Sequence, residues 1–425
     1  MGNNGTLHAR ANTMPIVIVG HVDHGKSTLV GRLFYDTGSL PEGKYDTVAR
    51  VCEETGKPFE FAFLLDALEE ERDQGITIDT TRARFHTAAR DYVLIDAPGH
   101  KEFLKNMVTG ASSAEAAILL IDAAEGVQEQ SRRHGYLLHL LGIRQVAVAI
   151  NKMDLVGYDQ GVYEAVRDEY TAFLQQLDVH PAWVIPIAAL SGDNVAAPSA
   201  RMPWYDGPTI VEALDAFTAR PPREGLPMRF PVQDVYKFDR RRIIAGRVEA
   251  GTLAAGDRIV FLPSGHRAVV KSIERWSSPK TGPAVAEESV GITLTEQLFI
   301  ERGEVASHET AMPLTGTELL AHVFWLGNRH LVVGRTCTLK LATQEIPCRV
   351  ESISAVVDTA TLVSAARQHE VAKNEVATVT LSLKGPAAFD VFTDIVETGR
   401  FVLVDGFDVA GGGVILPPVE DNYAI

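Results

Sequence analysis

The stretch Gly20-His21-Val22-Asp23-His24-Gly25-Lys26-Ser27 decides the fold of the first half of this chain. It fits the pattern G-x-x-x-x-G-K-[S/T], follows the apolar run of residues 16–19 and leads into a helical pattern near Lys26. Glycines in such a loop let backbone N–H groups turn toward phosphate oxygens, while the lysine reaches the β- and γ-phosphates and the serine hydroxyl binds Mg²⁺. The stretch predicts a triphosphate-binding loop between a strand and a helix, although alone it would also fit an ordinary Gly-containing turn.

The predicted phosphate contacts include most of this loop. His21 and His24 lie inside it, and we interpret both as loop residues without a catalytic part. The residues predicted to contact phosphate are Gly20, Val22, Asp23, His24, Gly25, Lys26, Ser27 and Thr28, joined by Gly99 from a later motif.

A second motif, Asp96-Ala97-Pro98-Gly99, follows the apolar run of residues 92–95. It places a carboxylate at the carboxyl end of a strand, where open α/β sheets bind ligands. We expect Asp96 to hold Mg²⁺ through water and the Gly99 N–H to bind the γ-phosphate, so that this loop senses whether that phosphate is present. His100 comes next, where hydrolases of this kind orient the attacking water, and it is the predicted catalytic residue.

A third candidate, Thr77, lies in Gly75-Ile76-Thr77-Ile78 between the two motifs. Its hydroxyl can bind Mg²⁺ and its backbone N–H can bind the γ-phosphate. The predicted metal-binding residues are therefore Ser27, Thr77 and Asp96. Taken alone, residues 75–78 would also fit the β-branched start of a strand. The order of the motifs along the chain favours the metal role.

The segment Asn151-Lys152-Met153-Asp154 follows a further apolar run, residues 145–150, and predicts the base. A carboxylate at Asp154 can accept from the ring N1–H and the 2-amino group of guanine, a pattern that adenine does not present. Asn151, Lys152 and Asp154 are the predicted guanine-binding residues of this motif. The expected nucleotide is therefore GTP or GDP, with Mg²⁺.

Apolar runs of buried-strand length alternate with helical patterns up to about residue 220. They cover residues 16–19, 92–95, 117–121, 146–150 and 183–187. Continuous apolar strands indicate a mostly parallel sheet covered on both faces. A helix is expected after Asp206-Gly207-Pro208, with Ile210, Leu214 and Phe217 on one face.

From residue 228 onward, short alternating strands and Gly-containing turns replace the helices, as in residues 243–248, 257–262 and 268–273. This pattern indicates β-barrels. The predicted fold is an α/β P-loop GTPase domain followed by two β-barrel domains. The expected boundaries are a flexible N-terminus at 1–13, a GTP-binding domain at 14–220, a linker at 221–227, and barrels at 228–312 and 313–425.

Composition limits the classes of function. A chain of 425 residues is too long for one ordinary core, and its net charge of −15 argues against a wholly basic nucleic-acid surface. Arg240-Arg241-Arg242 could contact RNA or an acidic partner, but such a short run also fits a solvated turn. No stretch approaches about 18 uninterrupted apolar residues. The three cysteines lack metal-ligand spacing, so we expect buried thiols in a reducing, cytoplasmic compartment.

The motifs at residues 21–27, 96–100 and 151–154 together resemble those of the translation-factor superfamily of GTPases. Residues 71–79 and the two segments 192–195 and 202–205 look like the branch shared by elongation factor 1 alpha and the GTPase subunit of sulfate adenylyltransferase. Residues 126–134, 141–143, 189–196, 228–233 and 262–265 favour the sulfate branch. The loop sequence His21-Val22-Asp23-His24 is instead the elongation-factor version.

The resemblance implies further site residues. The guanine-supporting Ser-Ala-Leu of the family stands here as Ala188-Ala189-Leu190, so a side-chain oxygen is missing. We expect the Ala189 N–H to reach the guanine O6 still, with weaker ordering of the loop. Val22 and Ile76 match the gate that holds the catalytic histidine, here His100, away from water until a partner binds. Low intrinsic turnover is therefore expected.

By resemblance, the chain is expected to be a GTP-hydrolysing regulatory subunit of a two-component sulfate adenylyltransferase. A separate catalytic subunit, an ATP sulfurylase, would transfer AMP from ATP to sulfate. The alternative is an elongation-factor-like carrier of aminoacyl-tRNA. A scaffold that no longer hydrolyses GTP is disfavoured, because the motif residues are present. No second phosphate loop is seen, so the adenylylsulfate kinase fused to some relatives is expected to be absent.

Overall fold

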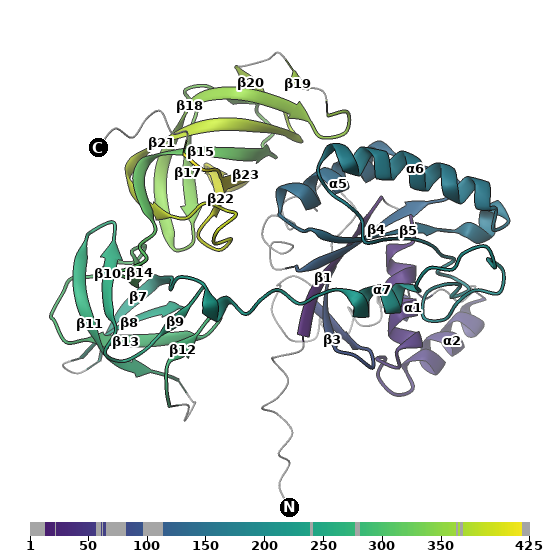
Figure 1. Ribbon diagram of the computed structural model, residues 1–425, viewed down its shortest axis with the longest axis horizontal. Helices are drawn as coiled ribbons and strands as arrows, with labels where there is room; N and C mark the ends of the chain where they lie inside the picture. The colour runs from purple at the N-terminus through teal and green to yellow at the C-terminus, as the bar shows by residue number, and fades with distance from the viewer. Residues whose placement is uncertain are drawn as a thin grey trace, which may run out of the picture. The chain divides into compact units, whose positions relative to one another are not determined.

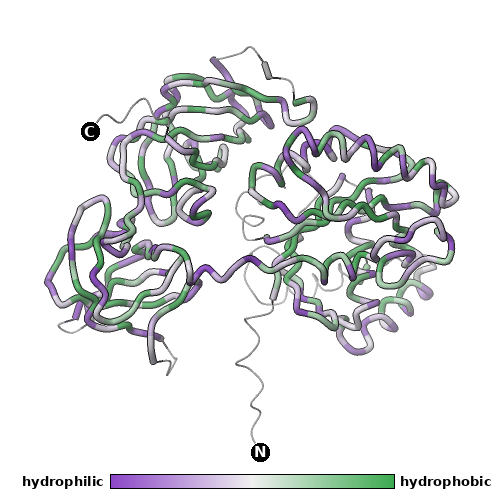
Figure 2. Tube along the Cα trace, viewed as in Figure 1, coloured by the Kyte–Doolittle hydropathy of each residue, from purple (hydrophilic) through white to green (hydrophobic). Residues whose placement is uncertain are grey.

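The computed structural model describes residues 13–21, 23–56, 61, 63–64, 82–96, 114–238, 241–276, 281–362, 364–365 and 369–418. The chain divides into two compact units, Met1–Arg220 and Pro221–Ile425. The first unit is a sheet with helices on its faces, and the second is built of strands (Figure 1). Hydrophobic residues concentrate along the inner strands of the first unit, whereas the segment that joins the two units is hydrophilic (Figure 2).

The first unit has a six-stranded sheet in the order β2-β3-β1-β4-β5-β6 among the described residues. All neighbouring pairs are parallel except β2–β3, which is antiparallel. The strands are β1 (Thr13–Gly20), β2 (Arg82–His86), β3 (Asp91–Asp96), β4 (Ala116–Asp122), β5 (Gln145–Asn151) and β6 (Trp183–Pro186). The five predicted apolar runs thus lie in strands β1, β3, β4, β5 and β6. The edge strand β2 was not predicted.

Helices cover both faces of this sheet. The helices are α1 (Lys26–Asp36), α2 (Lys44–Thr55), α5 (Glu129–Leu140), α6 (Gln160–Gln176) and α7 (Ile210–Ala216), with a 3₁₀ turn η2 (Met153–Val156). Leu33 of α1 and Leu214 of α7 pack in one buried cluster with Ile18 of β1. The helices α5 and α6 lie on the opposite face (Figure 1). Within the described part of the chain, no helix is long and apolar enough to cross a membrane.

The helix expected after Pro208 begins slightly later than the sequence suggested. Thr209 caps α7, because its hydroxyl accepts from the Glu212 N–H while the Glu212 carboxylate accepts from the Thr209 N–H. This reciprocal arrangement is a capping box. The helix ends at Ala216, so Phe217 lies just outside it, yet Phe217 is still buried in the same cluster as Leu214.

The second unit contains a closed six-stranded barrel in the order β10-β11-β13-β8-β7-β14. Its strands are β7 (Phe230–Phe238), β8 (Arg241–Arg247), β10 (Arg258–Leu262), β11 (His266–Glu274), β13 (Ser289–Leu294) and β14 (Val305–His308). A small pair, β9 (Thr252–Leu253) and β12 (Ala284–Val285), accompanies it, and a 3₁₀ turn η3 (Arg223–Gly225) precedes it.

The second barrel follows the order β17-β22-β23-β15-β21-β18-β19 and closes through pairing of β17 with β18. Its strands are β15 (Leu314–Trp325), β17 (Thr336–Leu341), β18 (Gln344–Asp358), β19 (Ser364–Ala365), β21 (Glu375–Phe389), β22 (Arg400–Asp405) and β23 (Asp408–Ile415), beside a pair of β16 (Leu331–Val332) with β20 (Glu370–Val371). The predicted fold class, a parallel-sheet P-loop domain followed by two β-barrels, is confirmed.

The glycine run Gly411-Gly412-Gly413 lies inside strand β23. A Cβ on Gly411 would lie 2.8 Å from the Phe324 carbonyl oxygen, and one on Gly413 would lie 2.5 Å from the Phe401 ring. The glycines therefore allow neighbouring strands and rings to approach closely.

A buried ion pair joins the two barrels within the second unit. The Arg229 guanidinium donates to both carboxylate oxygens of Asp390, each at 2.8 Å, and also to the carbonyls of Met228 and Ala311. The Asp390 carboxylate accepts a further hydrogen bond from the Thr398 hydroxyl. Both charged side chains are nearly inaccessible to solvent, but each is paired and hydrogen-bonded, as a buried charge requires.

The chain is fixed on both sides of the junction between the two units. In the first unit, the Arg220 N–H donates to the Glu115 carboxylate at 2.8 Å. In the second unit, Arg223 forms an ion pair with Glu397 at 2.7 Å, and its carbonyl accepts from the Gly251 N–H at 2.8 Å.

The three cysteines are free and buried, in agreement with the expectation of buried thiols. Cys337 and Cys348 lie opposite each other in the β17–β18 pair. Burial raises the pKa of the Cys337 thiol to about 11 and that of Cys348 to about 12. Both groups therefore stay protonated and unreactive near neutral pH.

Candidate functional site

The phosphate loop connects strand β1 to helix α1. Asp23 and Gly25 have positive φ values of 65° and 87°, which turn the backbone of the loop sharply. Gly25 is the N-cap of α1, so the first helical turn, whose N–H groups have no partner within the helix, begins at the loop. A Cβ on Gly25 would lie 2.5 Å from the Asn151 side-chain nitrogen, so a larger residue does not fit here.

Lys26 extends across this loop rather than into solvent. Its ammonium group donates to the carbonyl of Gly20 at 2.8 Å and to that of His21 at 2.7 Å. The positive charge is thus positioned at the centre of the loop. Ser27 and Thr28 belong to the first turn of α1, where Ser27 is exposed and its hydroxyl is accessible to a ligand.

Asn151, at the end of strand β5, connects the phosphate loop to the predicted guanine loop. Its amide nitrogen donates to the carbonyl of His24 at 2.8 Å, and its amide oxygen accepts from the Ala189 N–H at 3.0 Å. The side chain is only 2% exposed. One buried amide therefore holds two loops that lie far apart in the sequence. The Ala189 N–H, which we expected to reach the guanine O6, is engaged by Asn151.

Lys152 and Asp154 follow at the start of the turn η2. Lys152 has a φ of 63°, and its ammonium group pairs with Asp122, at the end of β4, at 2.8 Å. Burial raises the pKa of Asp122, but hydrogen bonds from Lys152 and from the Ala124 N–H outweigh it, so the net pKa is lowered. Asp122 thus stays charged and orients Lys152. Asp154 is exposed, so its carboxylate is free to meet a base.

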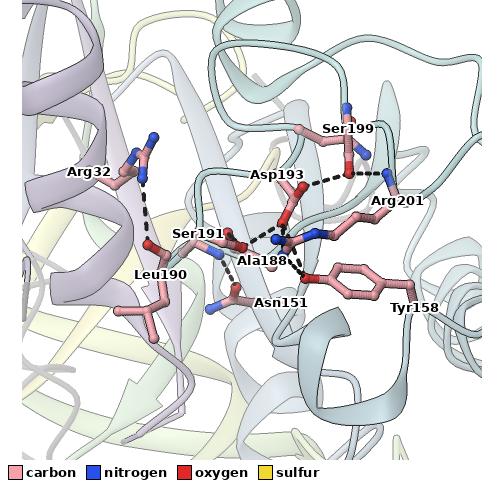
Figure 3. Close-up of polar contacts among 11 residues, drawn as sticks. Arg32, Asn151, Tyr158, Ala188, Leu190, Ser191, Asp193, Ser199 and Arg201 are labelled. Carbon is pink, nitrogen blue, oxygen red and sulfur yellow. Dashed lines mark hydrogen bonds and ion pairs between the residues drawn. The ribbon is translucent and has the colours of Figure 1, made fainter.

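The loop of residues 188–193 is ordered by Asp193, which sequence reasoning did not identify. The Asp193 carboxylate accepts from the hydroxyls of Ser199 at 2.6 Å, Ser191 at 2.5 Å and Tyr158 at 3.3 Å. Arg201 contacts both Asp193, at 3.4 Å, and the Tyr158 hydroxyl, at 2.6 Å. Figure 3 shows these side chains converging on Asp193.

The backbone of the same loop is also held from within. The Ala188 N–H donates to the Asp193 carbonyl and the Asp193 N–H donates to the Ala188 carbonyl, both at 3.2 Å. The exposed Leu190 accepts a long hydrogen bond from Arg32 of α1 at 3.5 Å. A network centred on Asp193 therefore holds this loop, although residue 188 is an alanine and has no side-chain oxygen. The Gly-Asp-Asn-Val segment of residues 192–195, which contains Asp193, was the available signal.

Comparison with known proteins identifies the family. The model of the elongation factor Tu GTP binding domain matches residues 11–220, and that of the GTP-eEF1A C-terminal domain-like family matches residues 318–416. Sulfate adenylyltransferase subunit 1 of Laribacter hongkongensis is 38% identical over 96% of this chain and 86% of that protein. The chain belongs to the translation-factor GTPase superfamily.

An elongation factor and a solved structure are also similar to this chain. Elongation factor 1-alpha of Pyrococcus horikoshii is 40% identical over 94% of this chain and 96% of that protein. Among solved structures, sup35 complexed with GDP has a TM-score of 0.45 and 24% identity, covering 96% of this chain and 94% of that one. Identity alone therefore does not separate the sulfate branch of this superfamily from its elongation factors.

The residues of this translation-factor GTPase fit a guanine nucleotide. Gly25 lets the loop approach the Asn151 side chain closely, Lys26 supplies a positive charge held against the loop, and α1 begins at the loop. Anions bind favourably at such a helix N-terminus. For Mg²⁺, Ser27 offers one hydroxyl oxygen at the loop, a hard ligand of the kind that this cation prefers.

Several predicted residues lie outside the described part of the chain. They are Val22 of the phosphate loop and the gate, Ile76 of the gate, Thr77 of the metal site, Gly99, and the catalytic candidate His100. The backbone of Asp96 is described and ends strand β3, next to β1 in the sheet. That position at the carboxyl edge of the sheet is the one that the sequence predicted for Asp96.

Proposed function

We propose that this chain hydrolyses GTP as the regulatory subunit of a two-component sulfate adenylyltransferase that acts in the cytoplasm. The arrangement that carries the GTP part is the single amide of Asn151 shared by the phosphate loop and the guanine loop. The similarity to a sulfate adenylyltransferase subunit 1 along nearly the whole chain supports the regulatory role. Acidic residues outnumber basic ones in the two-barrel unit as well, which disfavours a protein whose main ligand is RNA.

In this proposal, Lys26 and the N–H groups around Gly25 bind the phosphates, assisted by Ser27 and Thr28 in the first turn of α1. Ser27 and Thr77, with Asp96 through water, would hold Mg²⁺, which neutralises part of the triphosphate charge when bound. His100 orients the attacking water, and Gly99 binds the γ-phosphate.

The proposed guanine contacts are Asp154 to the N1–H and 2-amino groups, with Asn151 and Lys152 shaping the pocket. Since the Ala189 N–H donates to Asn151, the Leu190 N–H is the better donor for the guanine O6. Among the described residues it makes no hydrogen bond, and the Asp193 network fixes the loop that carries it. We therefore include Ala188, Ala189 and Leu190 as the base-recognition loop.

The proposed partner is a catalytic ATP sulfurylase subunit that converts ATP and sulfate to adenylyl sulfate and diphosphate. Val22 and Ile76 would hold His100 away from the water until this partner binds, which predicts slow turnover of the chain alone. The second candidate is a carrier of aminoacyl-tRNA, favoured by the 40% identity to an elongation factor 1-alpha.

The test is to capture partners from source-cell lysate with a tagged His100→Ala variant loaded with GTP. Recovery of an adenylyltransferase, followed by GTP-dependent formation of adenylyl sulfate from ATP and sulfate, supports the proposal. Recovery of tRNA and ribosomal proteins supports the second candidate. Lys26→Ala is the control, because it should abolish triphosphate binding and with it any GTP-dependent capture.

In the same material, His100→Ala is expected to bind GTP normally and to slow partner-stimulated hydrolysis by about 10²- to 10⁴-fold, the range for a positioned water-orienting group. An equal loss of GTP binding and turnover would remove His100 from the catalytic role. Rapid hydrolysis by the wild-type chain without a partner would contradict the gate.

A further inference from the structure

Three donor side chains gather on the side of the phosphate loop that faces strand β4. His21, His24 and Glu125 each place one potential ligand atom within 4.8 Å of the other two. The two histidine rings lie 5.2 Å apart, centroid to centroid. Glu125 follows β4 on a turn that Asp122 stabilises, because the Asp122 carboxylate accepts from the N–H groups of Ala124 and Glu125. The group therefore joins a loop to a fixed turn.

His24 is fully buried, and its hydrogen bonds determine which ring nitrogen carries the hydrogen. Its Nδ1 lies 3.2 Å from the Leu120 carbonyl oxygen, which can only accept, so Nδ1 carries the hydrogen. In the neutral ring, Nε2 then presents a lone pair. That atom lies 3.3 Å from a carboxylate oxygen of Glu125, another acceptor. Two acceptors at this distance require a proton or a cation between them.

His21 provides an independent observation. Its Nδ1 is buried and makes no hydrogen bond to any described residue. Buried polar atoms in folded proteins are nearly always satisfied, and an exception points to a missing water or ion. The ring that carries this atom is the same ring that places a nitrogen near His24 and Glu125.

The chemistry of these donors selects the kind of cation. Two imidazoles and one carboxylate suit zinc and similar transition metals, whereas Mg²⁺ prefers oxygen ligands alone. In a tetrahedral site with bonds of about 2.0–2.1 Å, two ligand atoms lie roughly 3.3–3.4 Å apart. The separation of 3.3 Å between His24 and Glu125 agrees with this edge. The Nδ1–H contact of His24 with a backbone carbonyl is the outer contact that metal-binding histidines usually make.

We propose that His21, His24 and Glu125 bind one divalent cation of the zinc class, separate from the Mg²⁺ of the nucleotide. The cation has three protein ligands and one open position, and it links the phosphate loop to the turn after β4. In the described conformation of the loop, the carbonyls of Gly20 and His21 accept hydrogen bonds from the Lys26 ammonium group. Because the cation binds the His21 side chain of this same loop, it stabilises the conformation in which Lys26 contacts the loop backbone.

The test is direct titration of the nucleotide-free full chain with Co²⁺, a coloured substitute for Zn²⁺, in excess Mg²⁺. We expect one equivalent to give the intense visible absorption of tetrahedral Co²⁺, and added Zn²⁺ to remove it. Glu125→Gln and His21→Gln should each weaken binding by at least about tenfold, the lower end of the loss seen when even an outer contact of a metal site is removed.

His180→Gln is the matched control, because His180 also lies beside a carboxylate, Asp178 at 3.5 Å, but on the open surface. It should bind Co²⁺ like the wild type. Glu125 is half exposed, so Glu125→Gln should fold normally, which a thermal melt without metal checks. Absence of Co²⁺ binding, or binding that survives both Glu125→Gln and His21→Gln, would overturn the proposal. Neither result depends on GTP hydrolysis, so it leaves the proposed function untouched.

Discussion

Replacing Asn151 with alanine tests whether one amide holds the phosphate and guanine loops together. The change removes the donor to the His24 carbonyl and the acceptor of the Ala189 N–H, and leaves both groups without their partner. Each stranded group costs about 1–2 kcal/mol, in the lower part of the usual range for a buried donor or acceptor that loses its partner. The total is about 2–4 kcal/mol.

If this free energy is lost from the loop conformation that binds nucleotide, GDP affinity should drop roughly 30- to 700-fold, since about 1.4 kcal/mol corresponds to a factor of ten. The assay is titration with a fluorescent GDP analogue, with thermal unfolding measured in parallel. Gln344→Ala is the matched control. Gln344 is a buried amide in the barrel unit, and it also makes one donated and one accepted hydrogen bond to backbone, both with Ala388.

The control should lose stability and keep nucleotide affinity. A decrease in GDP affinity below about threefold in Asn151→Ala would refute the idea that this amide organises the site. An equal decrease in Gln344→Ala would show that general destabilisation explains the effect.

Four further predictions follow from the described contacts. Asp193→Ala should weaken GDP binding about tenfold by loosening the guanine loop, measured by the same titration; an unchanged affinity would mean that the backbone contacts suffice. Gly25→Ala should weaken GDP binding more than Asn151→Ala does, because it adds about 1–2 kcal/mol of left-handed strain to a clash; normal binding would contradict the close approach. Asp390→Ala should destabilise the barrel unit by about 3–5 kcal/mol in denaturant melts, because it leaves the Arg229 charge buried and unpaired. The double variant Asp390→Ala with Arg229→Met should recover most of this loss. No recovery would argue against the unpaired charge as the cause. The pKa of Asp122 is lowered in the folded chain, so its contribution to stability is present above the ordinary aspartate pKa of about 3.9 and is lost as the pH falls through the lower folded value. Asp122→Asn should therefore make the stability of the chain less dependent on pH in the acid range. An unchanged pH dependence would count against the shift.

Much of the fold was predictable, because continuous apolar strands and a glycine-rich loop each have a strong local signature. Strands β4 and β5, for example, are apolar and buried along nearly their whole length. Strand β2 was missed for the opposite reason. It reads Arg-Ala-Arg-Phe-His, mostly polar, and only its antiparallel pairing with the edge of the sheet makes it a strand. Pairing across the chain leaves no local pattern.

The glycines of β23 show the same limit. A glycine run indicates a turn when it is considered alone, and its place in a strand depends on rings and carbonyls of other strands that approach it. The start of α7 is set by a cap that the sequence does contain, Thr209 with Glu212. This pair marks the first residue of the helix more accurately than Pro208 does.

At the site, the motifs identified residues by chemistry but not by partner. Nothing in the sequence near Ala189 showed that its N–H is taken by Asn151, and nothing near Lys152 indicated Asp122, because both contacts arise from neighbouring strands of the sheet. Thr77, Gly99 and His100 lie outside the described residues, so their roles stay predictions.

The contacts on either side of the junction limit how the two units can reorient. The Arg220 N–H is held by the first unit, and Arg223 is held by both its side chain and its carbonyl in the second. Between them stand only Pro221 and Pro222, whose rings fix φ. Any rotation must therefore come from a few backbone torsions between Arg220 and Arg223, each with a small number of favoured values. Such a hinge would step between discrete orientations instead of rotating continuously.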